Sequence, residues 1–328
     1  MSVVDDLHLE GRPLLVTSPT PRKLAAEPIA ADFEERGIEP AIVTVEEASF
    51  EAVESVIDAA EEVDASYLIG VGGGKAIDIA KMATDHLDTG FLSVPTAASH
   101  DGIVSNRGSV PDGNTRHSVA AEPPLAVVAD TGILANAPWE LTTAGCADII
   151  SNYTAVMDWR LPPTQERRVL RVRGRPRGDD RRNSRRQRRH DPPRPRGVRL
   201  DRHQGAHVLG GGDVHREFLP AASGAEHLFS HQLDRLAPGA ALHGHQVGVG
   251  SIMTAYLHEG ESGIWTEIRD ALASIDAPTT AADLGIDDET VIEALTTCHA
   301  IRDRYTILGD GMDERAAREV AVKTGVIG

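Results

Sequence analysis

The chain has 328 residues, of which 25% are charged and 41% hydrophobic, and its formal net charge is -17 at pH 7. This length allows two domains with substantial cores, and the negative charge argues against a general nucleic-acid binder. The two cysteines are too few for a disulfide framework. No apolar run reaches about 18 residues and no basic-then-apolar leader is present, so we expect a cytoplasmic protein without membrane insertion.

Charge is divided unevenly along the chain. Residues 162–216 contain 17 arginines, no lysine and six acidic residues, a local charge of +11. The rest of the chain holds 16 of the 33 basic and 44 of the 50 acidic residues, a charge of -28. A salt-filled cytoplasm favours such an acidic, lysine-poor surface, because carboxylates keep it hydrated while salt screens their repulsion. The composition therefore predicts a halophilic source.

The first 95 residues alternate between short apolar runs and amphipathic stretches. The apolar runs predict strands at 12–16, 41–45, 66–71 and 91–94. Apolar residues at helical spacing predict helices at 23–37, 49–63 and 76–85. Strands and helices that alternate in this way are typical of a parallel sheet covered by helices. We therefore expect an α/β domain over residues 1–140.

Three glycines, Gly72, Gly73 and Gly74, connect the third predicted strand to the next helix. Glycine at a strand end permits positive φ and close approach of another backbone or a ligand. The helix that follows would direct its first N–H groups at the turn, which suits a pyrophosphate. Tight packing of strand against helix is the alternative, and the spacing matches neither G-x-G-x-x-G nor a Walker loop.

Small and hydroxyl residues follow the fourth predicted strand, in SVPTAASHDGIVSN at 93–106. Open α/β sheets bind ligands at the carboxyl ends of their strands. The hydroxyls of Thr96, Ser99 and Ser105 could bind ribose or the nicotinamide carboxamide, and Asp101 could meet a substrate hydroxyl. An Asp-Gly turn without a ligand is the alternative.

A carboxylate, Asp148, lies in an apolar stretch at 142–152 that predicts the start of a buried helix. An N-cap is one interpretation. The apolar neighbours Ala147 and Ile149 favour burial instead, where an unpaired charge is costly. A divalent cation would supply the partner.

Residues 162–216 show neither helical nor strand periodicity and contain six prolines. Arg, Pro, Gly and His dominate when GC-rich coding DNA is translated in the wrong frame, and acidic, patterned sequence resumes near Glu217; we favour this interpretation. A natural disordered linker is the second, because such a composition buries too little apolar area to offset chain entropy. A basic arm that binds nucleic acid is the third.

Three histidines after the arginine-rich segment, at 227, 231 and 243, are candidates for a metal site. A helix would place His227 and His231 on one face, and the break at Pro238 would let a second segment return His243 to that face. Two neutral imidazoles and one carboxylate form a metal site with open coordination positions. Helical patterns continue to the end of the chain, at 248–257, 265–275, 288–300 and 314–322. We therefore expect a helical domain over residues 141–328.

With these motifs in this order, the chain resembles the glycerol-1-phosphate dehydrogenase family, within the group of iron-containing alcohol dehydrogenases, glycerol dehydrogenases and dehydroquinate synthases. The resemblance covers residues 1–161 and about 218–328, and it departs at 162–216. The matching segments are GVGGGKAIDIAK, SVPTAASHDGIVS, GCADIISNYTAVMDW, SGAEHLFSHQLDRLAPG, LHGHQVGVG, APTTAADLGID and RYTILGDG.

The resemblance implies a dehydroquinate synthase-like fold, in which an α/β dinucleotide-binding domain precedes an all-α metal-binding domain. It also implies reversible hydride transfer between NAD(P)H and dihydroxyacetone phosphate, which gives sn-glycerol 1-phosphate for archaeal ether lipids. Another enzyme of the group, such as glycerol dehydrogenase, and an inactive remnant stay open as alternatives. We expect a homo-oligomer.

Site roles follow from the resemblance by position. Asp148, His227 and His243 would hold the metal, with zinc favoured over iron. Asp101 and His231 would be catalytic and would contact substrate, as would Asp148. NAD or NADP would contact a larger set: Gly72, Gly73, Gly74, Lys75, Ala76, Ile77, Asp78, Thr96, Ala97, Ala98, Ser99 and Ser105.

Overall fold

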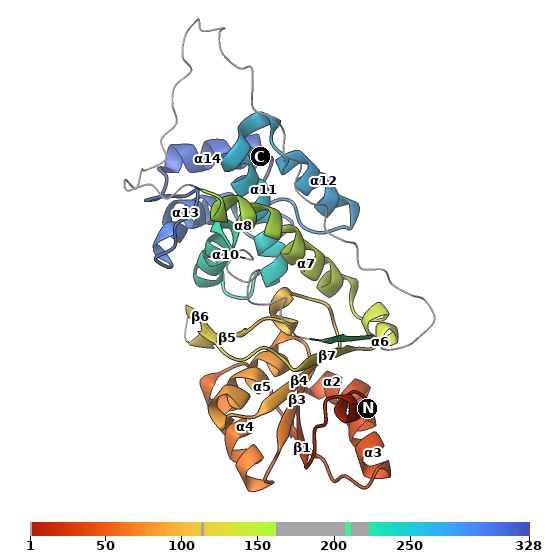
Figure 1. Cartoon of the computed structure of the whole chain (residues 1–328). Coiled ribbons are helices and arrows are strands. Elements are labelled where there is room, and N and C mark those ends of the chain that lie inside the picture. The colour runs from red at the N-terminus through yellow and green to blue at the C-terminus, as the bar shows by residue number, and fades with distance from the viewer. Residues whose placement is uncertain (1, 113–114, 162–206, 211–222) are drawn as a thin grey trace, which may run out of the picture.

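The computed structural model describes residues 2–112, 115–161, 207–210 and 223–328. The chain forms two parts (Figure 1): a sheet with helices on both sides, and a group of helices above it. The N-terminus lies in the part with the sheet and the C-terminus lies in the helical part. The predicted fold, a parallel α/β region followed by a helical region, is confirmed.

Among the described residues, a six-stranded sheet has the order β2-β1-β3-β4-β7-β8. Its first five strands in this order run parallel, and β8 pairs antiparallel with β7. The strands are β1 (Pro13–Thr17), β2 (Ala41–Thr44), β3 (Tyr67–Gly72), β4 (Gly90–Pro95), β7 (Ala126–Ala129) and β8 (His207–Gly210). The predicted strands correspond to β1 to β4.

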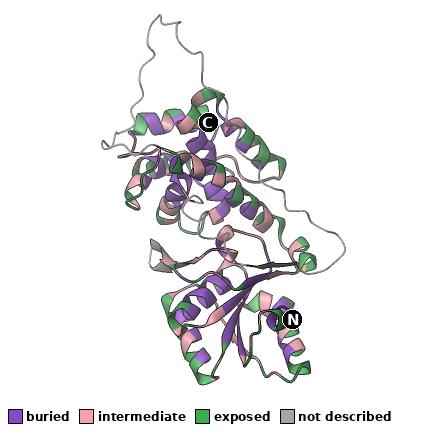
Figure 2. Cartoon of the chain, viewed as in Figure 1, coloured by how far each residue is buried: buried purple, intermediate pink, exposed green. Residues whose placement is uncertain are grey.

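The central strands are buried on both faces because their side chains alternate between two apolar clusters. Leu14 and Leu68 pack with α4 (Phe50–Glu62) and α5 (Gly74–Leu87) on one face. Leu15 and Ile69 pack with α1 (Ser2–Asp6) and α3 (Glu27–Glu35) on the other. Figure 2 shows the burial of these strands. The covering helices are α1 (Ser2–Asp6), α2 (Pro19–Pro21), the π-helix η1 (Arg22–Ala26), α3 (Glu27–Glu35), α4 (Phe50–Glu62), α5 (Gly74–Leu87) and α6 (Thr131–Ala135).

The arginine-rich segment 162–216 lies outside the described residues except for His207–Gly210. Those four residues form β8, a short strand that the aperiodic sequence did not predict. The physical reason is that β7 would otherwise expose an edge of unpaired N–H and C=O groups. Antiparallel pairing with β8 supplies partners for them.

The helical part surrounds one long, buried helix, α11, whose residues 244–255 are all buried. The helices of this part are α7 (Trp139–Ile150), α8 (Asn152–Trp159), α10 (Ala225–Leu236), α11 (His243–Glu259), η4 (Gly260–Ser262), α12 (Trp265–Ser274), α13 (Asp288–Thr297), η5 (Cys298–Ala300) and α14 (Glu314–Lys323). None of the helices in the described ranges has the length and apolar character that a membrane-spanning segment requires.

Two elements differ from expectation near the carboxylate. The helix that contains Asp148 begins at Trp139, so Asp148 lies in its last turn and the predicted helix start is wrong. The residues before 142 extend the helix because nothing in them breaks it after Pro138. A two-stranded hairpin, β5 (Arg107–Asp112) and β6 (Thr115–Ala120), was not predicted.

Candidate metal and substrate site

Three separate elements bring Asp148, His227 and His243 together. One ligand atom from each lies within 4.8 Å of the others. Asp148 comes from the end of α7, His227 from the first turn of α10, and His243 from the start of α11. Pro238 and Gly239 lie between the two histidine helices, as the sequence predicted. The arrangement offers two nitrogens and a carboxylate oxygen to one cation.

Asp148 is 2% exposed, and its two oxygens have different environments. Oδ2 accepts a hydrogen bond of 2.7 Å from the backbone N–H of Asp101. Oδ1 has no hydrogen-bond donor among the described residues, although His227 Nε2 lies 3.5 Å away and His243 Nε2 3.9 Å away. A buried carboxylate oxygen without a donor is costly, and a cation between these atoms would satisfy it.

His227 is held by a second buried carboxylate. Its Nδ1 lies 3.0 Å from Glu226 Oε1, and Thr154 Oγ1 donates a 2.9 Å bond to Glu226 Oε2. Burial opposes protonation of the imidazole, but Asp148 and Glu226 outweigh burial and raise the pKa of His227 to about 10. The two carboxylates therefore favour a positive charge at this position, which a proton or a metal ion can supply.

His243 is oriented by a chain of hydrogen bonds. Gln246 Nε2 donates to Asp234 Oδ1 at 3.2 Å, which leaves Gln246 Oε1 as an acceptor for the Ser230 hydroxyl at 2.7 Å. Because the hydroxyl proton is used there, the Ser230 oxygen accepts from His243 Nδ1, 2.9 Å away. This tautomer keeps the lone pair of His243 Nε2 directed at Asp148, as metal coordination requires.

Glycine allows the site elements to approach closely. A Cβ at Gly145 would lie 1.9 Å from the backbone oxygen of Ala98, and a Cβ at Gly244 would lie 2.0 Å from that of Ala144. Any other residue at these positions would push α7 away from the 96–101 loop, or α11 away from α7. Because Gly145 and Gly244 have no side chain, Asp148 can reach both the Asp101 loop and His243.

Asp101 and His231 lie beside the cluster. Asp101 begins the short 3-10 helix η2 (Asp101–Ile103); burial and the nearby Asp148 raise the pKa of its carboxyl group. The ring of His231 is 5.9 Å from that of His243, between centroids. Arg302 Nη2 lies 3.3 Å from His231 Nε2. The structure thus places both predicted catalytic residues beside Asp148, His227 and His243.

The predicted cofactor residues lie at the carboxyl ends of β3 and β4. Gly72 ends β3 with φ +147°, Gly73 caps α5 and Gly74 begins it. The backbone N–H of Thr96 donates a 2.9 Å bond to the oxygen of Gly72, which joins the two loops. Lys75, Ala97, Ala98 and Ser99 lie in these segments, and Ala76 and Ile77 are buried in α5.

Two residues of the predicted cofactor set have structural partners. Asp78 is buried; its Oδ1 lies 3.5 Å from Lys81 Nζ, and its Oδ2 accepts from the N–H of Ser109. Lys81, also buried, donates to the backbone oxygens of Gly102 and Arg107. The hydroxyl of Ser105 is 3.2 Å from the oxygen of Arg107. These side chains hold the loop that carries Asp101.

Several site residues carried no signal in the sequence. Glu226 is adjacent to His227, and adjacent helical residues do not share a face. Thr154, Ser230 and Gln246 are buried polar residues of α8, α10 and α11, and their spacing in the sequence does not differ from that of ordinary core residues. Only the packing of α8, α10 and α11 shows what they contact.

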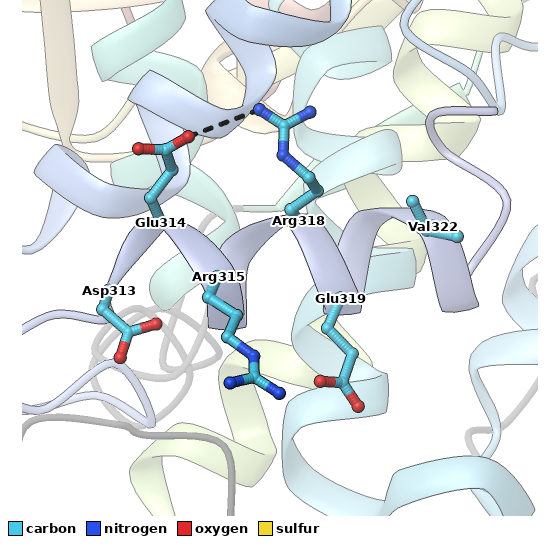
Figure 3. A pocket seen from close by; sticks show the side chains of 6 residues that line it. All are labelled: Asp313, Glu314, Arg315, Arg318, Glu319 and Val322. Carbon is cyan, nitrogen blue, oxygen red and sulfur yellow. Dashed lines mark hydrogen bonds and ion pairs between the residues drawn. The ribbon is translucent and has the colours of Figure 1, made fainter.

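Two hollows on the surface of the described residues contain none of the predicted site residues. One lies along the exposed side of α14, where Arg318 pairs with Glu314 (Figure 3). Another lies between α4, α5 and β6 and includes Phe50, Met82 and Val119. Both are lined largely by charged or exposed side chains. Neither is therefore a better candidate for a catalytic site than the cluster of Asp148, His227 and His243.

Known proteins resemble this chain in sequence. The family model of iron-containing alcohol dehydrogenases matches residues 2–138. A glycerol-1-phosphate dehydrogenase, NAD(P)+, from Halobacterium salinarum is 59% identical over 342 residues, which cover 100% of this chain and 93% of that protein. The chain belongs to the glycerol-1-phosphate dehydrogenase family. A protein of the same name from Haloarcula marismortui is also 59% identical, with 100% of this chain and 93% of that protein covered.

The glycerol-1-phosphate dehydrogenase family was the resemblance predicted from the motifs, and it is confirmed. Solved structures agree on the fold. A probable glycerol dehydrogenase from Sinorhizobium meliloti superimposes with a TM-score of 0.64 at 16% identity, over 98% of this chain and 92% of that one. This likeness supports the two-part architecture alone.

Proposed function

We propose that the chain catalyses NAD(P)H-dependent reduction of dihydroxyacetone phosphate to sn-glycerol 1-phosphate, and the reverse oxidation. The convergence of Asp148, His227 and His243 beside Asp101 and His231 carries this proposal. The site lies where the Asp101 loop, at the carboxyl edge of the sheet, meets the helical part. Hydride donor and acceptor would therefore meet between a nucleotide-binding edge and a metal cluster.

The glycine turn would hold the cofactor. A Cβ at Gly73 would meet no atom within 4 Å, so the turn has open space where a pyrophosphate would approach. The α5 N-terminus lies behind it and presents unpaired backbone N–H groups. When bound, NAD(P)H supplies the hydride. Thr96 and Ser99, on the neighbouring loop, would contact the nicotinamide half.

We propose zinc as the metal, held by Asp148, His227 and His243. Two imidazoles and one carboxylate with an open position are the ligand set of catalytic zinc sites, while iron is the alternative. A bound divalent cation supplies positive charge that favours negative charge on the ketone oxygen during reduction. Glu226 and Ser230 fix the two rings so that each presents Nε2 to the ion.

Asp101 and His231 would contact the substrate. Burial and the neighbouring Asp148 raise the pKa of the Asp101 carboxyl group, and its backbone bond to Asp148 supports a position beside the substrate. The half-buried His231 ring lies next to His243, with 5.9 Å between the ring centroids. It would orient the substrate, whose ketone oxygen must receive a proton after hydride arrives.

The purified protein tests this function directly. We expect oxidation of NADH or NADPH that depends on dihydroxyacetone phosphate, and NAD(P)+ reduction with sn-glycerol 1-phosphate in preference to the sn-3 enantiomer. A glycerol dehydrogenase would instead prefer unphosphorylated dihydroxyacetone. Elemental analysis of the purified protein decides between zinc and iron. Absence of turnover in a correctly folded, metal-loaded sample would reject the proposal.

We further propose a cytoplasmic, halophilic homo-oligomer. The acidic composition supports the salt requirement, because molar salt would screen the repulsion among carboxylates. Large exposed side chains on α7 and α8 support assembly: Trp139, Ile149, Tyr153 and Trp159. Light scattering in high salt should give a mass above that of one chain, and lowering the salt should lower the melting temperature.

A further inference from the structure

Arg302 is a half-buried arginine at the edge of the metal cluster. It follows η5, which packs near α10, the helix that carries His231. Its Nη2 lies 3.3 Å from His231 Nε2. The His231 ring in turn lies 5.9 Å from the ring of His243. One imidazole therefore separates this guanidinium from a predicted metal ligand.

The described contact of the Arg302 guanidinium is with an imidazole and not with a carboxylate. Among the described residues its hydrogen-bond partner is the His231 ring, and no carboxylate forms an ion pair with it. A guanidinium only donates, so His231 must accept with Nε2 and carry its proton on Nδ1. A half-buried cation whose partner is a neutral ring favours an additional, anionic partner.

Three further arginines act on the same position. Burial lowers the pKa of Arg302, and the charges of Arg107, Arg304 and Arg235 lower it further. They come from different elements: Arg107 from β5, Arg304 from the loop after η5 and Arg235 from α10. Like charges brought together beside a site give a positive potential that attracts anions.

We propose that Arg302 forms the centre of a subsite for the phosphate group of the substrate. This inference rests on the proposed function, since it assigns the phosphate end of the same three-carbon substrate. The ketone would lie at the cluster of Asp148, His227 and His243, and the phosphate would lie beyond the His231 ring. Arginine suits this role because its planar fork matches phosphate oxygens in a bidentate manner.

The test compares phosphorylated and unphosphorylated substrates in three variants: Arg302→Gln, Arg302→Lys and the control Arg318→Gln. Arg318 lies on α14 and pairs with Glu289, so its replacement removes the same charge away from the cluster. In Arg302→Gln we expect KM for dihydroxyacetone phosphate to rise about tenfold or more relative to any change with dihydroxyacetone. Arg302→Lys should recover part of this loss, because it restores the charge without the fork.

Calorimetry with sn-glycerol 1-phosphate and with inorganic phosphate measures binding without turnover. Arg302→Gln should weaken both ligands by a similar factor, while Arg318→Gln should weaken neither. Metal content and melting temperature must match those of the wild-type protein. Equal losses with both ketones, or unchanged phosphate binding, would overturn the subsite. If the wild-type protein binds phosphate through Arg302 but does not reduce dihydroxyacetone phosphate, the proposed function fails and the anion subsite stands.

Discussion

The backbone N–H of Asp101 donates a 2.7 Å hydrogen bond to Oδ2 of Asp148, 47 residues further along the chain. This bond joins the loop after β4 to the end of α7, and so connects the sheet part to the helical part at the site itself. Because Oδ2 is occupied, Oδ1 is the oxygen that faces His227 and His243. The same bond fixes Asp101 beside the cluster.

Replacing a predicted metal ligand and replacing its neighbour should have different effects on metal content and turnover. We expect His227→Ala to lose the bound metal and activity together, because it removes a nitrogen and leaves Oδ1 of Asp148 without its nearest imidazole. His231→Ala should keep the metal and lose turnover, since His231 is placed beside the ligands rather than among them. Metal analysis with steady-state kinetics distinguishes the two. Full metal content in His227→Ala would contradict the ligand assignment.

A methyl group on the glycine turn should affect cofactor binding selectively. Gly73→Ala should weaken NADPH binding about tenfold or more with little change in melting temperature, because its Cβ would enter open space that the cofactor needs. Gly74→Ala is the matched comparison: its Cβ would lie 2.2 Å from His100 Nε2, so the His100 side chain must shift. Fluorescence titration of NADPH and thermal unfolding provide the measurements. Equal cofactor affinity in wild type and Gly73→Ala would show that the pyrophosphate lies elsewhere.

Close approach of α11 to α7 should be sensitive to a single methyl group. Gly244→Ala places a Cβ 2.0 Å from the oxygen of Ala144, so we expect a loss of about 1–3 kcal/mol in stability and weaker metal binding. Gly250→Ala, on the same helix, meets Phe229 and Glu226 at 3.0–3.2 Å and should cost less. Denaturant unfolding of both variants, with metal titration, checks the order. A Gly244→Ala protein as stable as Gly250→Ala would indicate that the helices can separate without consequence.

The two cysteines should differ in reactivity. Cys146 is exposed and Cys298 is buried, and burial raises the pKa of the Cys298 thiol to about 12. Since the thiolate is the reactive form, iodoacetamide near neutral pH should modify Cys146 in the native protein and Cys298 only after unfolding. Mass spectrometry of the labelled peptides measures this. Labelling of Cys298 in the folded state would contradict its placement in the helical core.

The same shift gives a direction for stability in alkali. The pKa of Cys298 is raised in the folded state, so its contribution to stability is full below the unfolded pKa of about 9. It falls as pH rises from that value toward about 12. Cys298→Ala should lessen this alkaline decline, and Cys146→Ser should leave it unchanged.

Local patterns were sufficient for the strands, the glycine turn and the candidate ligands. The apolar runs at 12–16 and 66–71 became β1 and β3 because buried parallel strands need apolar residues on both faces. The four-residue spacing of His227 and His231 put both on α10. Burial of Asp148 followed from its apolar neighbours, although its place at the end of α7 did not.

Long-range contacts decided the rest. Residues 207–210 form a strand because they pair with the edge of β7. Their own composition does not predict this pairing. Glu226, Ser230 and Gln246 support the candidate ligands because the packing of α10 and α11 buries them against His227 and His243. Arg302 reached His231 from 71 residues away. Sequence periodicity determined which side chains share a face of one element, whereas hydrogen bonds and charges between elements depend on distances that only the packed chain fixes.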